Sequence, residues 1–403
     1  HNQGKKIRFW GAPDFTNAWT RLMEFNIDII GTDDVQGLMT FLKNKKKNFY
    51  QNTTFHSVYK PTYSYTKKTG APKNVILMIG DGMGLTQLYS GFTANRGALN
   101  IFQLNTIGFS VTNSSDSYIT DSAAGATAMA TGKKTNNRFI GVDSLGLPLI
   151  SIAEQVKKAG FRTAIISNGD ITDATPASFY AHQPERSLSE AIANDFVSSN
   201  NDILIGSNTK AFNNRSDGKN LFKALSQKGY TVTEDLKTMD TIRNNKFVVI
   251  DNIAGASIAN GRGDFLSKAV RKSLSSLTKD GKPFFMMTEG AQIDHGGHAN
   301  DVSYVVQEML DFDKAVGEAM KFIDTNGETL LIITADHETG GLSLIGGDIT
   351  KGNVMGNFST SDHTSVMVPV FSYGPGSESF KGVFPNTAIH DKIAELLSLK
   401  KKQ

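Results

Sequence analysis

The run Asn74-Val75-Ile76-Leu77-Met78-Ile79-Gly80, followed by Asp81-Gly82-Met83-Gly84, decides the fold prediction. An unbroken apolar run of this length is typical of a strand that is buried on both faces of a parallel sheet. Asp81 then lies at the carboxyl end of the strand, and its glycine neighbours let a bound ion approach closely. Taken alone, Asp81 could equally be a turn residue that caps a helix.

Further apolar runs alternate with amphipathic segments along the rest of the chain. The predicted strands cover residues 163–167, 247–250, 283–288, 329–334 and 366–373. The predicted helices cover residues 149–159, 220–227, 265–277 and 302–323. This alternation predicts an α/β fold with a doubly wound, mostly parallel central sheet flanked by helices. Ligands of such sheets bind beyond the carboxyl ends of the strands.

The composition excludes several classes of protein. Hydrophobic residues make up 39% of the 403 residues and charged residues 20%, which excludes a disordered chain. The formal net charge of +3 is too close to neutral to indicate binding of nucleic acid or of a membrane surface. No apolar run approaches the roughly 18 residues that indicate a membrane-spanning helix. The absence of cysteine excludes disulfides, thiolate metal sites and a cysteine nucleophile.

The segment Thr120-Asp121-Ser122-Ala123-Ala124-Gly125 opens a predicted helix with very small side chains. Ser122 falls at or just before the first turn, where unpaired backbone amides and the helix dipole favour an anion. A serine in this place could attack a phosphorus atom whose oxygens are held by those amides. The alternative interpretation is an ordinary N-cap serine.

The segment 289–298 follows the predicted strand 283–288 and is rich in metal-ligating residue types. Glu289 ends the strand, and Asp294, His295 and His298 follow in the loop. Asp294 and His298 are four residues apart, so they can share one face of a helix and bind one metal. Solvated polar loop residues are the alternative.

Two further segments place histidine beside aspartate at strand ends. Asp336 and His337 follow the predicted strand 329–334, and His363 precedes the strand 366–373. Four of the eight histidines therefore lie in such loops. Together these segments could supply the ligands of two metal ions: Asp81, Asp294, His298, Asp336, His337 and His363. Because imidazoles favour zinc over magnesium or calcium, we expect both ions to be zinc. Two such ions can clamp the attacking and leaving oxygens of a phosphoryl displacement.

From about residue 72 to the C-terminus, the chain resembles the alkaline phosphatase family, and its motifs follow one another in the order that is typical of that family. The most specific are Asp121-Ser122-Ala123 and Thr334-Ala335-Asp336-His337. The resemblance implies hydrolysis of small phosphate monoesters through a phosphoserine at Ser122, serving phosphate scavenging. It implies one zinc on Asp294, His298 and His363, and a second zinc on Asp81, Asp336, His337 and the Ser122 oxygen.

The resemblance also implies a third metal site, usually for magnesium, and a phosphate-clamping arginine. The matching ligands are Asp81, Asp173, Thr175 and Glu289. His295 occupies a position that tunes this site, and we expect it beside Asp173. Because Asp173 with His295 combines patterns from different branches of the family, the identity of the third ion stays open. Arg186 matches the arginine, whose fork geometry suits two phosphate oxygens.

Two alternatives to a phosphomonoesterase remain, one a different enzyme and the other a protein without catalytic activity. A phosphodiesterase or sulfatase of the same superfamily generally uses a threonine or modified cysteine nucleophile and lacks the arginine, so Ser122 with Arg186 argues against one. An inactive phosphate- or metal-binding protein would be expected to lack a ligand, and none is missing. The resemblance further implies a periplasmic or extracellular enzyme and is compatible with a homodimer.

Residues 1–60 lie outside this resemblance. A strand and turn at 6–14, a helix at 17–25, a strand at 28–31 and a helix at 35–42 weakly resemble the end of a glycerophosphodiester phosphodiesterase-like (β/α)₈ barrel. Two βα units cannot close a barrel of eight, so we interpret residues 1–60 as the remnant of such a domain in a bifunctional phosphodiesterase–phosphatase. The alternative is an N-terminal arm packed on the phosphatase. We assign residues 61–71 to a linker and 72–403 to the phosphatase domain.

Overall fold

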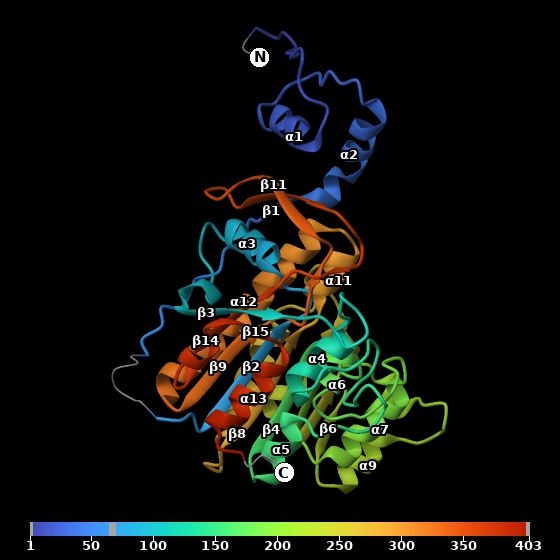
Figure 1. The fold of residues 1–403 in the computed structure, drawn as a ribbon, viewed down its shortest axis with the longest axis vertical. Coiled ribbons are helices and arrows are strands. Elements are labelled where there is room, and N and C mark those ends of the chain that lie inside the picture. Colours follow the sequence, from blue (N-terminus) through green and yellow to red (C-terminus); the bar gives the residue numbers. More distant parts are fainter. Residues whose placement is uncertain (1–2, 64–69, 400–403) are drawn as a thin grey trace.

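A computed structural model describes residues 3–63 and 70–399 and has a ten-stranded sheet at its centre, with helices on both faces (Figure 1). The strand order is β15-β3-β14-β9-β2-β8-β4-β5-β7-β6. Only β14 runs antiparallel to its neighbours within this sheet. The predicted fold class is therefore confirmed. The strands are β2 (Asn74–Gly80), β3 (Thr106–Val111), β4 (Arg162–Asp170), β5 (Ile203–Ser207), β6 (Thr231–Thr233), β7 (Phe247–Ile250), β8 (Phe284–Gly290), β9 (Thr329–Thr334), β14 (Val368–Tyr373) and β15 (Gly382–Pro385).

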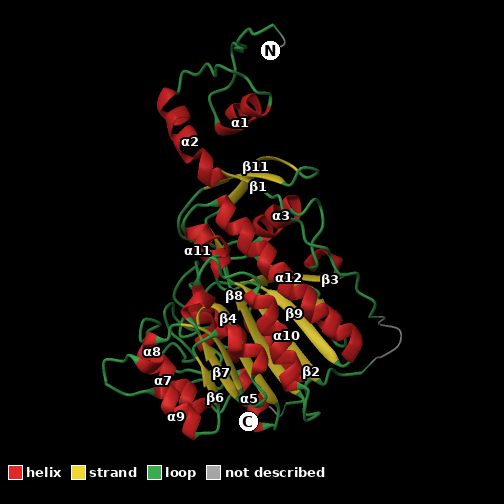
Figure 2. Cartoon of the chain, turned by 180° about the vertical axis from the view of Figure 1, so that it is seen from behind, coloured by secondary structure: helices red, strands yellow, loops and turns green. Residues whose placement is uncertain are grey.

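Two helical layers cover the sheet, and alternate side chains of each central strand face one layer or the other. In β2, Ile76 and Met78 pack against one layer, which contains α3 (Leu85–Ala94), α10 (Phe265–Leu277) and α12 (Val302–Asn326). Figure 2 shows α10 and α12 in front of the sheet. Val75, Leu77 and Ile79 pack on the opposite layer. That layer contains α4 (Ser122–Thr131), α5 (Ile152–Lys158), α7 (Ser189–Ser199), α9 (Leu221–Gln227) and α13 (Thr387–Leu396). Among the described helices, none is long and apolar enough to cross a membrane.

Four neighbouring strands at the middle of the sheet end beside one another. Asp81 follows β2, Glu289 lies at the end of β8, Asp336 follows β9 and Asp173 follows β4. The remaining helices near this edge are short: α6 (Ala174–Ala177), α8 (Lys210–Asn213) and α11 (Gln292–His298). The carboxyl edge of the sheet therefore collects the predicted ligands, as the parallel topology requires.

The N-terminal residues form two helices, α1 (Thr16–Glu24) and α2 (Val35–Asn48), which project from the body (Figure 1). The predicted strands at 6–14 and 28–31 are wrong, because only a single bridge between Arg8 and Ile29 forms there and no further strand extends it. Helix α2 continues beyond its predicted end at residue 42 through a run of lysines. Lysine is a good helix former and is favourable at a helix C-terminus.

Residues 49–63 run along the body of the molecule. Strand β1 (Phe49–Gln51) pairs with β12 (Asn353–Phe358), which pairs in turn with β11 (Leu342–Asp348). His56 Nε2 lies 2.8 Å from an oxygen of the buried Asp313, and the hydroxyls of Tyr59 and Thr62 donate to Asp324. The first residues of the predicted 61–71 linker are thus held on the body, whereas residues 64–69 lie outside the described residues. The domain division itself stays a prediction.

We expect Asp313→Ala to lower the free energy of unfolding by about 3 kcal/mol or more. Besides contacting His56, the carboxylate accepts hydrogen bonds from the amides of Asn100 and Ile101. Each buried donor left without a partner costs about 1–3 kcal/mol. Thermal unfolding and limited proteolysis of residues 49–63 provide the measurement, with the exposed Asp240→Ala as control. An unchanged melting temperature together with unchanged proteolysis would contradict this account.

Candidate active site

Ser122 is the first residue of α4 and is almost completely buried. Asp121 caps the helix, because its Oδ1 accepts a hydrogen bond from the amide of Ala124 at 3.0 Å. The helix can lie against the end of β9 because its residues are small. A Cβ at Gly125 would lie 3.2 Å from the Cβ and carbonyl oxygen of Asp336. This close packing places the Ser122 hydroxyl beside the carboxyl edge of the sheet.

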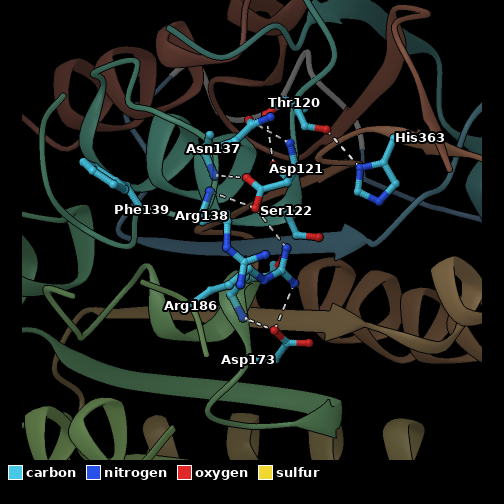
Figure 3. Close-up of polar contacts among 12 residues, drawn as sticks. Thr120, Asp121, Ser122, Asn137, Arg138, Phe139, Asp173, Arg186 and His363 are labelled. Carbon is cyan, nitrogen blue, oxygen red and sulfur yellow. Dashed lines mark hydrogen bonds and ion pairs between the residues drawn. The ribbon is translucent and has the colours of Figure 1, made fainter. Parts of the chain in front are cut away.

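A first cluster of ligand-type side chains contains Asp294, His298 and His363. His298 Nε2 lies 3.3 Å from Asp294 Oδ2 and 3.2 Å from His363 Nε2. In both histidines, Nδ1 faces a backbone carbonyl, that of Ser361 at 2.7 Å and that of Thr120 at 2.9 Å (Figure 3 shows the second). Because a carbonyl only accepts, Nδ1 carries a proton in both rings, and Nε2 is the atom that each ring turns toward the cluster.

A second cluster contains Asp81, Asp336 and His337, all buried. His337 Nε2 lies 3.2 Å from Asp336 Oδ2, 3.4 Å from Asp81 Oδ1 and 3.1 Å from Ser122 Oγ. The rings of His337 and His363 stack with centroids 3.6 Å apart, so the two clusters adjoin. The six residues that the sequence predicted as ligands of two ions are therefore brought together with the serine.

The two clusters fit divalent cations. Asp81 Oδ1 and Asp336 Oδ2 are buried and have no hydrogen-bond partner among the described residues. In the first cluster, the Nε2 atoms of two imidazoles face each other. Unpaired buried carboxylate oxygens are costly unless a cation joins them, and the convergent Nε2 atoms offer such a cation nitrogen ligands. Carboxylate oxygens with imidazole nitrogens are ligands that transition metals prefer.

The pKa values of the buried acids reflect the same crowding. Burial raises the pKa of Asp336 to about 6, with a further contribution from the charge of Asp294. Burial and then the charge of Asp336 raise the pKa of Asp81 well above its usual value. Burial lowers the pKa of His337, so this ring is neutral and cannot compensate the two carboxylates.

The residues predicted for a third ion lie behind Asp81. Thr175 Oγ1 is 3.3 Å from Asp81 Oδ2, and Glu289 is buried and accepts a hydrogen bond from Ser167. Burial raises the pKa of Glu289 to about 8, and the charge of Asp173 adds to the shift. His295 contacts Gln292, with Nδ1 3.2 Å from Oε1. No hydrogen bond among the described residues joins His295 to Asp173, so their expected proximity stays a prediction.

Arg186 lies between Asp121 and Asp173, close to Ser122 (Figure 3). Its two terminal nitrogens are 3.1 Å and 3.0 Å from these carboxylates. Burial alone would lower the pKa of Arg186, but the charges of Asp173 and Asp121 raise it, so the guanidinium stays charged. This cation at the rim is placed to attract an anion to the serine.

Comparisons with known proteins agree with this geometry. The family model described as alkaline phosphatase matches residues 72–358. The chain belongs to the alkaline phosphatase family. It is 30% identical to alkaline phosphatase 4 of Bacillus subtilis, over 81% of this chain and 88% of that protein. Alkaline phosphatases are phosphomonoester hydrolases, so the protein is a metal-dependent phosphatase.

Solved structures show the same relationship. The structure of alkaline phosphatase from the Antarctic bacterium TAB5 superposes with a TM-score of 0.78 and 40% identity, and the match covers 83% of this chain and all of that chain. A variant of the TAB5 enzyme, described as having Mg bound in the M3 site, matches with a TM-score of 0.77 and the same identity and coverage. Residues 1–71 fall outside the matched family model.

Sequence reasoning missed residues that hold the ligands in place. Thr339 contacts both Asp294 and His337, and Ser167 holds Glu289. Asp121 belongs to the serine motif, and in the structure it both caps α4 and binds Arg186. The position of Asp121 directly before a helix start is a capping signal that could have predicted the first role. Serine and threonine hydroxyls give no such signal.

We predict that the unfolding free energy of the metal-free protein falls as the pH rises from about 6.5 to 8. The raised pKa of Glu289 means that the folded state binds more protons than the unfolded state, in which glutamate titrates near pH 4.3. The unfolding free energy then falls with rising pH. The hydrogen bond to Asp294 raises the pKa of His298 to about 9, so this stabilisation is also lost as the pH rises toward 9. His337, whose pKa is lowered, changes stability only below about pH 6.5.

Thermal unfolding of chelator-treated and metal-loaded protein at several pH values tests this expectation. The melting temperature of the treated protein should fall across the range, and its difference from the loaded protein should widen, because cations compensate the ionised carboxylates. Melting temperatures that stay parallel across this pH range would contradict the argument.

Proposed function

We propose that Ser122 is the nucleophile of a two-step hydrolysis of phosphate monoesters. The supporting observation is its position: Oγ lies 3.1 Å from Nε2 of His337, where both ligand clusters and Arg186 meet. The start of α4 favours the negative charge of a phosphoryl group. In the first step, an oxygen–phosphorus bond forms at Ser122 as the phosphorus–oxygen bond to the alcohol breaks, and the proton of the Ser122 hydroxyl ends on the released alcohol. In the second, water displaces the serine, which releases phosphate and restores the hydroxyl.

We propose that the two clusters each hold a zinc ion. Asp294, His298 and His363 would hold one, and Asp81, Asp336 and His337 the other, because mixed imidazole and carboxylate sets are typical of zinc. When bound, such ions supply Lewis acidity to the phosphoryl oxygens and to the attacking hydroxyl or water. The protein residues contribute the fixed direction of the Nε2 lone pairs and a buried, preorganised setting.

We propose magnesium as the third ion. The candidate ligands, Asp81, Asp173, Thr175 and Glu289, offer hard oxygens that suit it. The TAB5 variant with Mg bound in its M3 site supports this assignment. His295 would modify the preference of the site from the residue next to Asp294.

We propose that the enzyme uses small phosphomonoesters to scavenge phosphate outside the cytoplasm. The Arg186 guanidinium favours the doubly charged phosphoryl group of a monoester over the singly charged groups of a diester or a sulfate ester, which argues against a phosphodiesterase or sulfatase. A homodimer stays a prediction for this chain. The packing of residues 49–63 on the body supports the arm interpretation for that stretch, and the barrel-remnant interpretation of residues 1–60 stays a prediction.

We predict that Ser122→Ala abolishes the phosphoenzyme and keeps the metals. Residual turnover can persist, since water activated at the cations can attack directly. Acid quenching after exposure to labelled substrate, followed by mapping of the labelled peptide, gives the measurement, and metal content is measured in parallel. Ser273→Ala, a buried serine on α10, is the matched control. Labelled phosphate on a residue other than Ser122 would overturn the assignment.

We predict that Arg186→Ala weakens inhibition by inorganic phosphate by about 1.5–3 kcal/mol, the range for hydrogen bonds to charged groups. This corresponds to roughly a 10- to 150-fold rise in the inhibition constant. Discrimination between monoesters and diesters should narrow, since a diester offers one fewer charged oxygen. Arg271→Ala on α10 is the control, because this exposed arginine pairs with Glu318 instead. Unchanged phosphate inhibition would contradict the proposed role.

A further inference from the structure

Thr339 lies between the two ligand clusters and contacts both. It is fully buried in the short strand β10 (Glu338–Thr339). Its hydroxyl donates a hydrogen bond to Oδ1 of Asp294 in the first cluster, and the same oxygen lies 3.2 Å from Nδ1 of His337 in the second. Strand β10 pairs with β13 (His363–Thr364) in a register that sets Thr339 opposite His363. One residue therefore touches three ligand-bearing segments.

The single proton of this hydroxyl fixes the direction of both contacts. A carboxylate only accepts, so the hydroxyl proton is used by Asp294. Thr339 Oγ1 can then only accept from His337, which places the imidazole proton on Nδ1. Nε2 is left with its lone pair directed at Asp81, Asp336 and the Ser122 hydroxyl.

His337 differs in this respect from the histidines of the first cluster. The Nδ1 atoms of His298 and His363 face backbone carbonyls, which no side-chain substitution removes. The orientation of His337 depends on a side-chain hydroxyl that also orients Asp294. The surroundings leave Thr339 little freedom: a Cβ at Gly82 would lie 2.7 Å from its Oγ1, and a Cβ at Gly297 would lie 2.8 Å from its Cγ2.

We propose that Thr339 is a positioning residue that couples the two metal clusters. Its hydroxyl orients Asp294 in the first cluster and holds His337 in the tautomer that a cation in the second cluster requires. Loss of this one hydroxyl should therefore weaken cation binding at both clusters. The inference rests on the two-cation site of the proposed function, and it adds the prediction that one hydroxyl connects the affinities of both positions.

Zinc binding by Thr339 variants tests the coupling. Zn²⁺ is titrated into chelator-stripped protein against a competing chelator, with wild type, Thr339→Val and Thr339→Ser compared. Thr339→Val keeps the shape and removes the hydroxyl. It should weaken zinc binding at both clusters by about 10- to 100-fold, the usual cost of losing a group that orients a ligand. Thr339→Ser should stay close to wild type. Thr329→Val is the control, because Thr329 lies at the start of β9, at the end away from the site, and this variant should bind zinc like wild type.

A spectroscopic readout separates positioning from a general loss of structure. Nitrogen-15 NMR of the metal-free protein should show the His337 proton on Nδ1 in wild type and Thr339→Ser, and a mixture of tautomers in Thr339→Val. If Thr339→Val does not fold, Thr339→Ala should give the same loss at both clusters. Wild-type affinity at either cluster in a folded hydroxyl-free variant would overturn the coupling. Failure of wild-type protein to bind zinc would instead overturn the two-zinc proposal.

Discussion

Mutual repulsion among buried carboxylates is the constraint on which this structure depends. Asp81, Glu289 and Asp336 lie side by side because β2 pairs in parallel with both β8 and β9, which brings their carboxyl ends together. Burial raises the pKa of all three, and the charges of neighbouring carboxylates, Asp294 and Asp173 among them, reinforce the shift. The apolar sheet and its two helical layers supply the rigidity that holds such groups together. Bound cations would offset the repulsion between these carboxylates and stabilise the folded state.

The rest of the site follows from how tightly these groups are packed. Gly82 has a φ of 70° and approaches Asp294 so closely that a Cβ would lie 2.9 Å from its Cα. Gly125 allows α4 to rest against Asp336, which brings the Ser122 hydroxyl into contact with His337. Arg186 lies between Asp121 and Asp173, beside Ser122, where we propose that it meets the phosphate group. The interior thus suits cations and the entrance suits a phosphate group.

The sequence predicted most strands that form apolar runs, although not β3 or β5, and it predicted the parts of the site that depend on strand ends. Strands β7 and β9 begin and end where the runs do, because both faces of each are buried. Strands β6 and β15, which are partly exposed at the sheet edges, have no comparable signal. The predicted strands near the N-terminus failed because strand propensity without a neighbouring strand does not build a sheet. Thr339 could not be predicted, since its role arises from the pairing of β10 with β13.

The most direct test of the central claim is a crystal structure of the metal-loaded protein with orthovanadate, with anomalous data collected at the zinc edge. Vanadate imitates a phosphoryl group in transfer, so it reports the nucleophile and the cation sites together. The account predicts one zinc peak among Asp294, His298 and His363, another among Asp81, Asp336 and His337, and vanadium bonded to Ser122 Oγ beside Arg186. Vanadium bonded to a different side chain, or zinc absent from both clusters, would contradict it.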